Sequence, residues 1–171
     1  AREGGTDNDD IVLQGVDSNG VDVRLRANDE IVLNGTISST GGGATTDIFL
    51  MGLTAGSTIA VGDTAVASAL FLSEGSLNNV AASFGGGIHI GDNTANGSAN
   101  QTGSIDVDES GGLLGILTTL TLHADAASID IGSNIDLQTG GDFVINGANA
   151  TTTITGNVTI LNYVVIDDFG K

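Results

Sequence analysis

The C-terminal third of the chain carries the pattern that decides the fold. Residues 120–160 read LTLHADAASIDIGSNIDLQTGGDFVINGANATTTITGNVTI. Apolar and polar residues alternate in short runs such as Leu120-Thr121-Leu122 and Ile135-Asp136-Leu137. Alternation with a period of two is typical of a strand with one buried face. The runs also repeat every 23 residues, and periods of about 20–50 residues indicate stacked structural units.

Five apolar positions in this stretch map onto another apolar residue at the 23-residue offset, and a sixth maps onto threonine. The matched pairs are Leu120 with Phe143, Leu122 with Ile145, Ile131 with Ile154, Ile135 with Val158, and Leu137 with Ile160, whereas Ile129 maps onto Thr152. Three separate strands therefore repeat in register. This repeat predicts three-sided coils, in which each side chain lies over its equivalent in the next coil.

The N-terminal third repeats less regularly. Residues 8–15 resemble residues 28–35 at an offset of 20, Val23 and Leu25 map onto Ile48 and Leu50 at 25, and Ile37 maps onto Ile59 at 22. Coils of about 20–25 residues are expected, as in other stacked repeats, and seven or eight would fit the chain. Residues 60–103 keep the rhythm poorly. Within them, residues 92–103 are nearly all Asn, Thr, Ser, Gly and Ala, which predicts an irregular, exposed loop.

The composition also favours strands and tight turns. The 171 residues include 27 Gly, no Pro and no Cys, and 40% are hydrophobic. Val, Ile and Thr favour strands, and Gly, Asn and Asp favour turns. We predict a single all-β domain over residues 1–171, folded as a parallel β-helix (β-solenoid). The alternative is a β-sandwich or jelly roll, which also has short strands separated by turns.

Two stretches resemble a known family. Residues 28–42 (NDEIVLNGTISSTGG), followed by TIAVG at 58–62, are similar in style and period to the repeats of filamentous-haemagglutinin-like bacterial surface adhesins. Residues 120–132, from LTLHAD to IDIG, are similar as well. The resemblance implies a right-handed parallel β-helix with an exported, surface-associated adhesive or structural role. It brings no catalytic residues with it.

The charge of the chain restricts its partners. There are 21 acidic and four basic residues, giving a net charge of −17. Nucleic acids and anionic membrane surfaces repel such a chain. The sequence contains no run of 18 apolar residues, so we expect no insertion into a membrane. We also expect an extracellular or cell-surface location.

One segment resembles a calcium-binding turn. Residues 4–13 read GGTDNDDIVL, which is similar to the Gly- and Asp-rich nonapeptide of calcium-binding β-rolls. Calcium prefers oxygen ligands, so Asp7, Asp9 and Asp10 are the metal candidates. The motif occurs once and does not repeat at nine residues. The alternative is a solvated acidic turn, and no other cofactor is expected.

Catalysis is not expected from the remaining polar residues. His89 and His123 lie far apart in the sequence, each on the polar phase of its strand, and we expect both to be exposed. Carboxylates occur in pairs at Asp9/Asp10, Asp106/Asp108 and Asp167/Asp168. Solenoids that cleave acidic sugars also need basic and aromatic residues, and this chain has few of either. We therefore expect that the protein is not an enzyme.

Both ends of the chain are strand-like, which favours self-association. Uncapped solenoid ends expose strand edges that another copy can pair with. The predicted assembly interface consists of Ile11, Val12 and Leu13 near the start and Val164, Val165 and Ile166 near the end. We expect a subunit of an extracellular filament, sheath or surface layer that assembles head to tail. A charge at Val165 is expected to break the joint.

Two other functions fit the same sequence. The chain could be a stalk or binding segment of a larger adhesin, with cell-surface glycans or other surface proteins as partners. It could also be a pilus-like fibre subunit that donates a strand to its neighbour, with residues 162–169 or 9–14 as the donated strand. Electron microscopy of the purified protein separates filaments from isolated particles.

Overall fold

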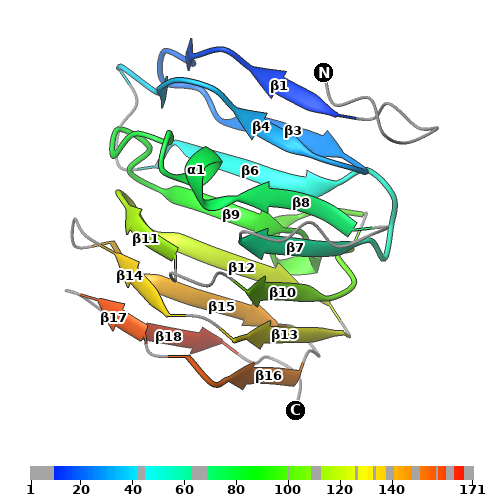
Figure 1. Cartoon of the computed structure of the whole chain (residues 1–171). Helices are drawn as coiled ribbons and strands as arrows, with labels where there is room; N and C mark the ends of the chain where they lie inside the picture. Colours follow the sequence, from blue (N-terminus) through cyan, green and yellow to red (C-terminus); the bar gives the residue numbers. More distant parts are fainter. Residues whose placement is uncertain are drawn as a thin grey trace.

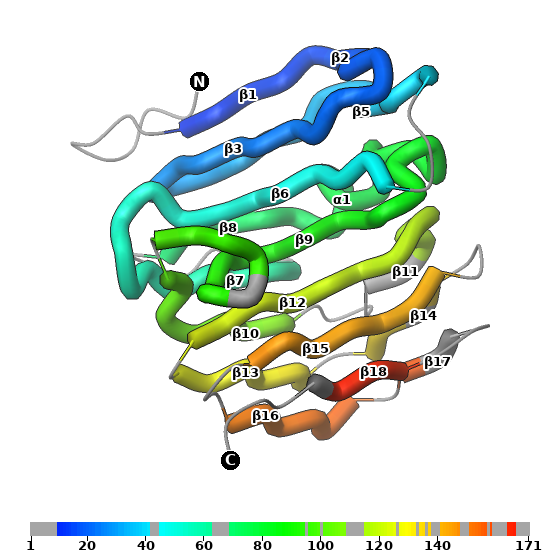
Figure 2. The backbone as a smooth tube through the Cα atoms, turned by 180° about the vertical axis from the view of Figure 1, so that it is seen from behind, coloured from blue at the N-terminus to red at the C-terminus, as the bar shows by residue number. Residues whose placement is uncertain are grey.

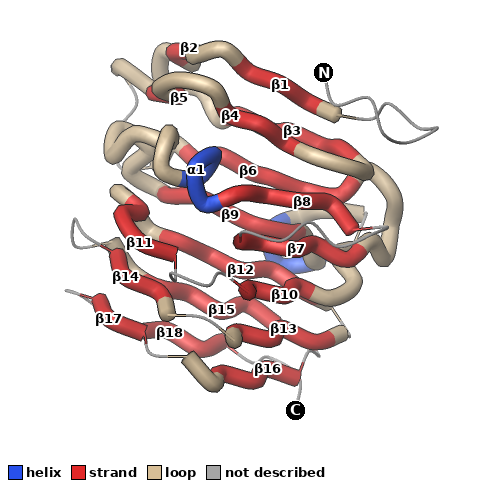
Figure 3. The backbone as a smooth tube through the Cα atoms, viewed as in Figure 1, coloured by secondary structure: helices blue, strands red, loops and turns tan. Residues whose placement is uncertain are grey.

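The computed structural model describes residues 10–41, 45–62, 69–99, 101–108, 113–125, 127–132, 134–137, 141–147, 151–156, 158–160 and 164–167. Within these ranges the protein is all-β (Figures 1 and 3). The strands are β1 (Ile11–Leu13), β2 (Val16–Asp17), β3 (Val23–Ala27), β4 (Ile31–Leu33), β5 (Ile37–Ser38), β6 (Asp47–Gly52), β7 (Thr58–Gly62), β8 (Ala69–Ser73), β9 (Gly87–Gly91), β10 (Ile105–Asp108), β11 (Leu113–Ile116), β12 (Leu120–Ala124), β13 (Ser128–Ile131), β14 (Ile135–Leu137), β15 (Phe143–Gly147), β16 (Thr151–Ile154), β17 (Val158–Ile160) and β18 (Val164–Asp167). A single turn of α-helix, α1 (Glu74–Leu77), and a 3₁₀ turn, η1 (Thr94–Asn96), complete the described elements.

All described strand pairings are parallel. The largest sheet has six strands in the order β18-β15-β12-β9-β6-β3, and a second has five in the order β16-β13-β10-β7-β8. A three-stranded sheet, β11-β14-β17, and two pairs, β1-β4 and β2-β5, make up the rest. The six-stranded sheet lies behind the others in Figure 1 and in front in Figure 2. A β-sandwich is built from antiparallel sheets, so the alternative prediction of a sandwich or jelly roll is wrong.

The C-terminal repeat is confirmed residue by residue. Leu120 pairs with Phe143 and Leu122 with Ile145, at the predicted offset of 23. The same offset holds in the two other sheets, where Ile131 pairs with Ile154 and Ile135 with Val158. Leu137 pairs with Ile160, and the one mismatch, Ile129 with Thr152, is also a true pair.

The N-terminal repeat is confirmed at two of its three offsets. Ile11 pairs with Ile31 at the offset of 20, and Val23 pairs with Ile48 at the offset of 25. The third is wrong, because Ile37 pairs with Val16 and bridges Val80. Ile59 pairs instead with Leu70 and Ile105, in the five-stranded sheet.

The middle of the chain departs from the repeat because one strand lies out of order. β8 follows β7 in sequence but lies on its N-terminal side, where Phe71 bridges Glu30 next to β4. In the six-stranded sheet the offset consequently grows to 40 between Ile48 and Ile88. The irregular segment between β9 and β10 lengthens the next offset to 32, between Ile88 and Leu120. Among the described residues the largest sheet has six strands, fewer than the seven or eight coils that were predicted.

The core consists of columns of aliphatic side chains from successive strands, with an occasional phenylalanine. In the six-stranded sheet, Ile48, Ile88, Leu120 and Phe143 are in register, and each has an exposed fraction of 0%. Burying one such side chain stabilises the fold by roughly 1.5–3 kcal/mol. The column keeps a single register because a shift of one residue would turn every core side chain outward.

Successive segments pack so closely that some positions have no room for a side chain. A Cβ atom at Gly141 would lie 2.4 Å from the carbonyl carbon of Thr118, whereas one at Gly132 would lie 3.7 Å from its nearest neighbour, the oxygen of Val107. The clash at Gly141 is with backbone, which cannot rotate away.

We predict that Gly141→Ala destabilises the protein and Gly132→Ala does not. Forcing a methyl group into a packed site costs about 1–3 kcal/mol, so Gly141→Ala should lower the free energy of unfolding by that amount. The measurement is the midpoint of urea unfolding followed by circular dichroism. Equal midpoints for the two variants would contradict the stacking of residue 141 on residue 118.

Candidate functional site

The six residues of the predicted assembly interface lie at the two ends of the strand stack. β1 has one described neighbour, β4, and β18 has one, β15. β16 and β17 are likewise edge strands at the C-terminal end, and β2 and β3 at the N-terminal end. Edge strands carry backbone N–H and C=O groups that another strand can pair with. Each end therefore offers three parallel edges.

At the C-terminal end, the last residues of the core columns are exposed to solvent. Val164 and Ile166 are in register with Phe143 and Ile145, whose exposed fractions are 0% and 1%. Val164 and Ile166 themselves are 47% and 56% exposed. They occupy core positions that no further layer of the described residues covers.

The same comparison divides the predicted interface into two kinds of residue. Val165 is in register with the half-buried Val144, on the outward phase of its strand, and Val12 is in the same position on β1, between the partly buried Ile11 and Leu13. Only Ile11, Leu13, Val164 and Ile166 continue the core columns. Val165 faces outward, so Ile166, which continues a core column, is the better position for a charge that tests the joint.

The metal candidates receive no support from the described residues. Asp7 and Asp9 lie outside the described ranges, and Asp10 is half-buried just before β1. Among the described residues, His, Asp and Glu side chains nowhere gather in groups of three or more that could hold a metal ion.

A polar cluster that the sequence analysis missed lies on the outward face of the six-stranded sheet. This face is not open to solvent: the outward residues Phe49, Met51, Thr121 and His123 have exposed fractions of 5%, 0%, 4% and 4%. The prediction that His123 is exposed is wrong, and His89 is half-buried. The alternation of apolar and polar residues marks only two faces of a strand; it does not reveal what covers them.

The two histidines contact each other although they lie on different strands, β9 and β12. Nδ1 of His89 lies 2.8 Å from Nε2 of His123, and Nε2 of His89 lies 3.1 Å from Oδ1 of Asp47. The ring centres are 5.1 Å apart and the planes 21° from parallel. With the two nitrogens only 2.8 Å apart, the ring centres reach a separation of 5.1 Å only if both nitrogens lie near the line that joins the centres. The rings therefore meet edge to edge. The other side of His89 stacks on Phe49, at 4.7 Å between ring centres.

The carboxylate of Asp47 fixes the direction of the hydrogen bonds between the two rings. An ionised carboxylate only accepts hydrogen bonds, so Nε2–H of neutral His89 donates to Asp47. Nδ1 of His89 then accepts from Nε2–H of His123. This leaves Nδ1 of His123 as a buried acceptor without a hydrogen-bond partner, and such an unsatisfied group costs stability.

The buried ring of His123 resists protonation. Burial, together with the smaller effect of the nearby His89, lowers the pKa of His123 to about 3. A metal ion would fit the pair poorly, because zinc needs three or four protein ligands and a ligating histidine normally donates its second N–H to a partner. The pair is suited to holding neighbouring strands together rather than to binding an ion.

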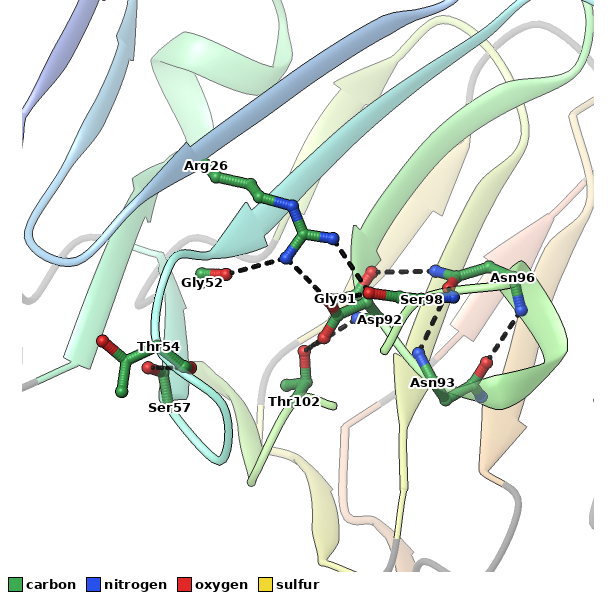
Figure 4. A network of polar contacts seen from close by, with 10 residues as sticks. All are labelled: Arg26, Gly52, Thr54, Ser57, Gly91, Asp92, Asn93, Asn96, Ser98 and Thr102. Carbon is green, nitrogen blue, oxygen red and sulfur yellow. Dashed lines mark hydrogen bonds and ion pairs between the residues drawn. The ribbon is translucent and has the colours of Figure 1, made fainter. Parts of the chain in front are cut away.

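A second network joins the segment after β9 to β3, the first strand of the sheet (Figure 4), and Asn93 extends it to β15. Nη1 of Arg26 on β3 lies 3.0 Å from Oδ2 of Asp92, which also accepts from Oγ of Ser98 at 2.6 Å. Thr102 donates to Oδ1 of Asp92 at 2.9 Å. Nδ2 of Asn93 donates to the backbone oxygen of Asn146 at 2.8 Å.

The predicted loop at residues 92–103 is irregular but not simply exposed. Its members Asp92, Asn93 and Thr102 have exposed fractions of 2%, 0% and 4%. The prediction of an exposed loop is thus wrong for these three residues. These residues are polar because their side chains form hydrogen bonds with one another and with backbone groups at the ends of neighbouring strands, as buried polar groups must.

Carboxylates line the outward face of the five-stranded sheet. Asp106 is paired in register with Asp130 and lies two residues from Asp108. Partial burial raises the pKa of Asp106, and the charges of Asp108 and Asp130 raise it further. These side chains repel one another at neutral pH, so this face resists contact with another acidic surface.

Comparison with known proteins gives no relative from which a function could be transferred. No family model, no curated protein and no solved structure matches the chain. In the described part of the chain, none of the helices has the length and apolar character needed to cross a membrane. Function must therefore be argued from the geometry of the ends and faces.

We predict that His123 makes the protein less stable as the pH falls. The unfolded chain takes up a proton near pH 6.5, whereas folded His123 does so only near pH 3. Stability should therefore fall between these values, by at most about 1.4 kcal/mol per pH unit. His123→Gln keeps a donor to His89 but cannot titrate, so its stability should fall less steeply in urea unfolding at pH 7, 6, 5 and 4. Parallel pH profiles for wild type and variant would contradict the burial of a neutral His123.

We also predict that Asp92 matters far more than Asp22. Asp22 forms an exposed pair with Arg24 at 3.7 Å, and such pairs contribute less than about 1 kcal/mol. Asp92→Ala leaves Arg26, Ser98 and Thr102 without their buried acceptor and should cost about 2–3 kcal/mol. Chemical denaturation of Asp92→Ala and Asp22→Ala measures the difference, and equal losses would show that the network is not structural.

Proposed function

We propose that the chain is a right-handed, three-sided parallel β-helix that acts as a non-enzymatic structural subunit of an extracellular filament, sheath or surface layer. Copies assemble head to tail through their terminal strands, and no cofactor takes part. The principal partner is another copy of the same chain.

The order of the strands supports the β-helix. β10, β11 and β12 belong to three different sheets, and β13, β14 and β15 pair with them in the same order. In Figure 1 the chain runs right to left along β10 at the front, passes β11 on the left, and returns left to right along β12 behind. Because it descends from the N-terminal end as it does so, this path is right-handed. The bridge Glu30–Phe71 joins the pair β1-β4 to the line of the five-stranded sheet, and the bridge Ile37–Val80 extends the pair β2-β5 to the segment after α1.

The open C-terminal end is the observation that carries the assembly proposal. Val164, Ile166 and Ile154 continue core columns, yet they are 47%, 56% and 37% exposed. They lie on edge strands of two sheets. A surface that combines apolar side chains with unpaired backbone groups favours the addition of a further parallel strand.

Charge favours growth along the stack rather than sideways. The chain carries a net charge of −17, and Asp106, Asp108 and Asp130 lie along the five-stranded sheet. Contact between two such faces is repulsive over about 10 Å at moderate ionic strength. The ends, in contrast, offer backbone groups and apolar columns.

The second candidate is a stalk or binding segment of a larger adhesin, whose partners would be surface glycans or proteins. The same open end favours it, because further coils of one longer chain would cover Val164 and Ile166 equally well. The two functions differ in concentration dependence: copies that assemble do so as their concentration rises, whereas a segment stays monomeric. A strand-donation fibre of β-sandwich modules gains no support from parallel sheets.

We predict that Ile166→Asp abolishes assembly and Val165→Asp does not. Ile166 is largely exposed in the single copy, so the substitution should leave the fold intact, but a joint would bury the unpaired charge, which is costly. Val165 faces outward and keeps access to water. Negative-stain electron microscopy and sedimentation should show filaments for wild type and Val165→Asp and single particles for Ile166→Asp, with circular dichroism confirming the fold of all three.

Wild-type protein that stays monomeric at high concentration would overturn the filament in favour of the adhesin segment. Filaments of Ile166→Asp would show that the joint does not involve the C-terminal core column.

A further inference from the structure

The two ends of the stack present the same arrangement of strands. β1 and β3 belong to the lines of the five-stranded and six-stranded sheets, and β2 pairs with β5, whose Ile37 bridges Val80 on the side of the three-stranded sheet (Figure 1). The last three strands, β16, β17 and β18, end the five-stranded, three-stranded and six-stranded sheets in that order. A second copy placed below the C-terminal end therefore presents the strands that a further coil of the same chain would have.

We infer that the joint has one defined register, in which β18 of one copy pairs in parallel with β3 of the next, β16 with β1, and β17 with β2. This inference rests on the head-to-tail filament proposed above and specifies its interface. The remaining question is which residues then face each other.

The columns of the six-stranded sheet give the answer. One inward column runs Val23, Ile48, Ile88, Leu120, Phe143 and Val164, and the next runs Leu25, Leu50, Ile90, Leu122, Ile145 and Ile166. Continued by one step, Val164 meets Val23 of the next copy and Ile166 meets Leu25. Val23 and Leu25 are only partly buried at the N-terminal end. The joint would therefore bury apolar side chains of both copies.

The five-stranded sheet gives a consistent register. Ile131 pairs with Ile154 at its C-terminal edge, and Ile11 pairs with Ile31 at the N-terminal end. Through the Glu30–Phe71 bridge these residues belong to one column, so Ile154 meets Ile11 of the next copy. All three contacts join aliphatic residues of similar size.

The outward columns place the two arginines of β3 at the joint. Arg24 and Arg26 of β3 are in register with Phe49 and Met51, and these columns continue to Val165 and Asp167 on β18. Only four residues of the chain are basic, and these two lie on the terminal strand of the largest sheet. The joint places Arg26 at the register position next to Asp167.

Charge and strand direction favour head-to-tail contact over the two symmetric alternatives. Two N-terminal ends in contact would bring Arg24 and Arg26 of both copies together. The other symmetric arrangement places two C-terminal ends in contact. Both arrangements would also make the new strand pairs antiparallel, whereas every described pair within the chain is parallel.

Cysteine crosslinking tests the register directly, because the chain contains no cysteine. In the inferred joint, Val165 of one copy is beside Arg24 of the next on the outward face, at the spacing of neighbouring strands of about 4.8 Å. This spacing lies within the range of about 4.4–6.8 Å between Cα atoms that a disulfide spans. Arg24 and Val165 are both substantially exposed in the single copy, at 52% for the arginine side chain and 42% for the valine.

The experiment mixes Val165→Cys with Arg24→Cys under oxidising conditions and follows disulfide-linked dimers on non-reducing gels. Each molecule has one thiol, so the expected product is a dimer band that either variant alone lacks. Val12→Cys replaces Arg24→Cys in the matched control, since Val12 is 40% exposed and outward but lies on β1. Adding Ile166→Asp to the Val165→Cys chain should remove the dimer.

The outcomes separate the register from the filament. A dimer formed by Val165→Cys alone indicates tail-to-tail contact and overturns the inference, and so does equal crosslinking with Val12→Cys. If electron microscopy shows filaments of the mixed variants without the expected dimer, the register is wrong while the filament stands. Wild-type protein that does not assemble removes the filament and the joint together.

Discussion

The fold depends on one constraint: each apolar side chain must lie directly over its equivalent in the neighbouring parallel strand. Leu122 is held between Ile90 and Ile145 in this way, and it is fully buried. Backbone hydrogen bonds between strands set the spacing, and the columns of side chains set the register, since a one-residue slip would turn each column outward. The close approach at Gly141 follows from the same spacing.

This constraint explains which parts of the structure the sequence could predict. Where a column is continuous, like residues repeat at a fixed offset, and the pairs Leu122–Ile145 and Leu137–Ile160 followed from counting alone. Where a strand is inserted, the offset gives no guidance. β8 follows β7 in sequence but lies between β7 and β4 in the stack. The match between Ile37 and Ile59 was therefore a coincidence of spacing. A periodic signal cannot show that two strands are exchanged in order.

The polar clusters were invisible for a related reason. The alternation of residues correctly placed His89 and His123 on the outward phase of their strands. The contacts that surround them come from residues far away in sequence, such as Asp47 and Phe49 next to His89. Asp92 contacts Arg26 across 66 positions of the chain. Such contacts satisfy buried polar groups, and no local pattern marks them. They join early and late parts of the same sheet, and so they strengthen the region where the repeat is least regular.

A stack held together by columns cannot complete itself at its ends. Every inner layer is covered on both sides, but the last layer keeps core residues on one side without cover, and Ile166 shows this with an exposed fraction of 56% against 1% for Ile145. A further layer of the same kind would cover these core residues but would leave its own core residues exposed. Within one chain this leads to longer solenoids or to a cap. In the assembly proposed above it would give open-ended growth, because the contact would join two different surfaces and would not close on itself. In that assembly, the acidic side faces would limit growth to the direction of the stack.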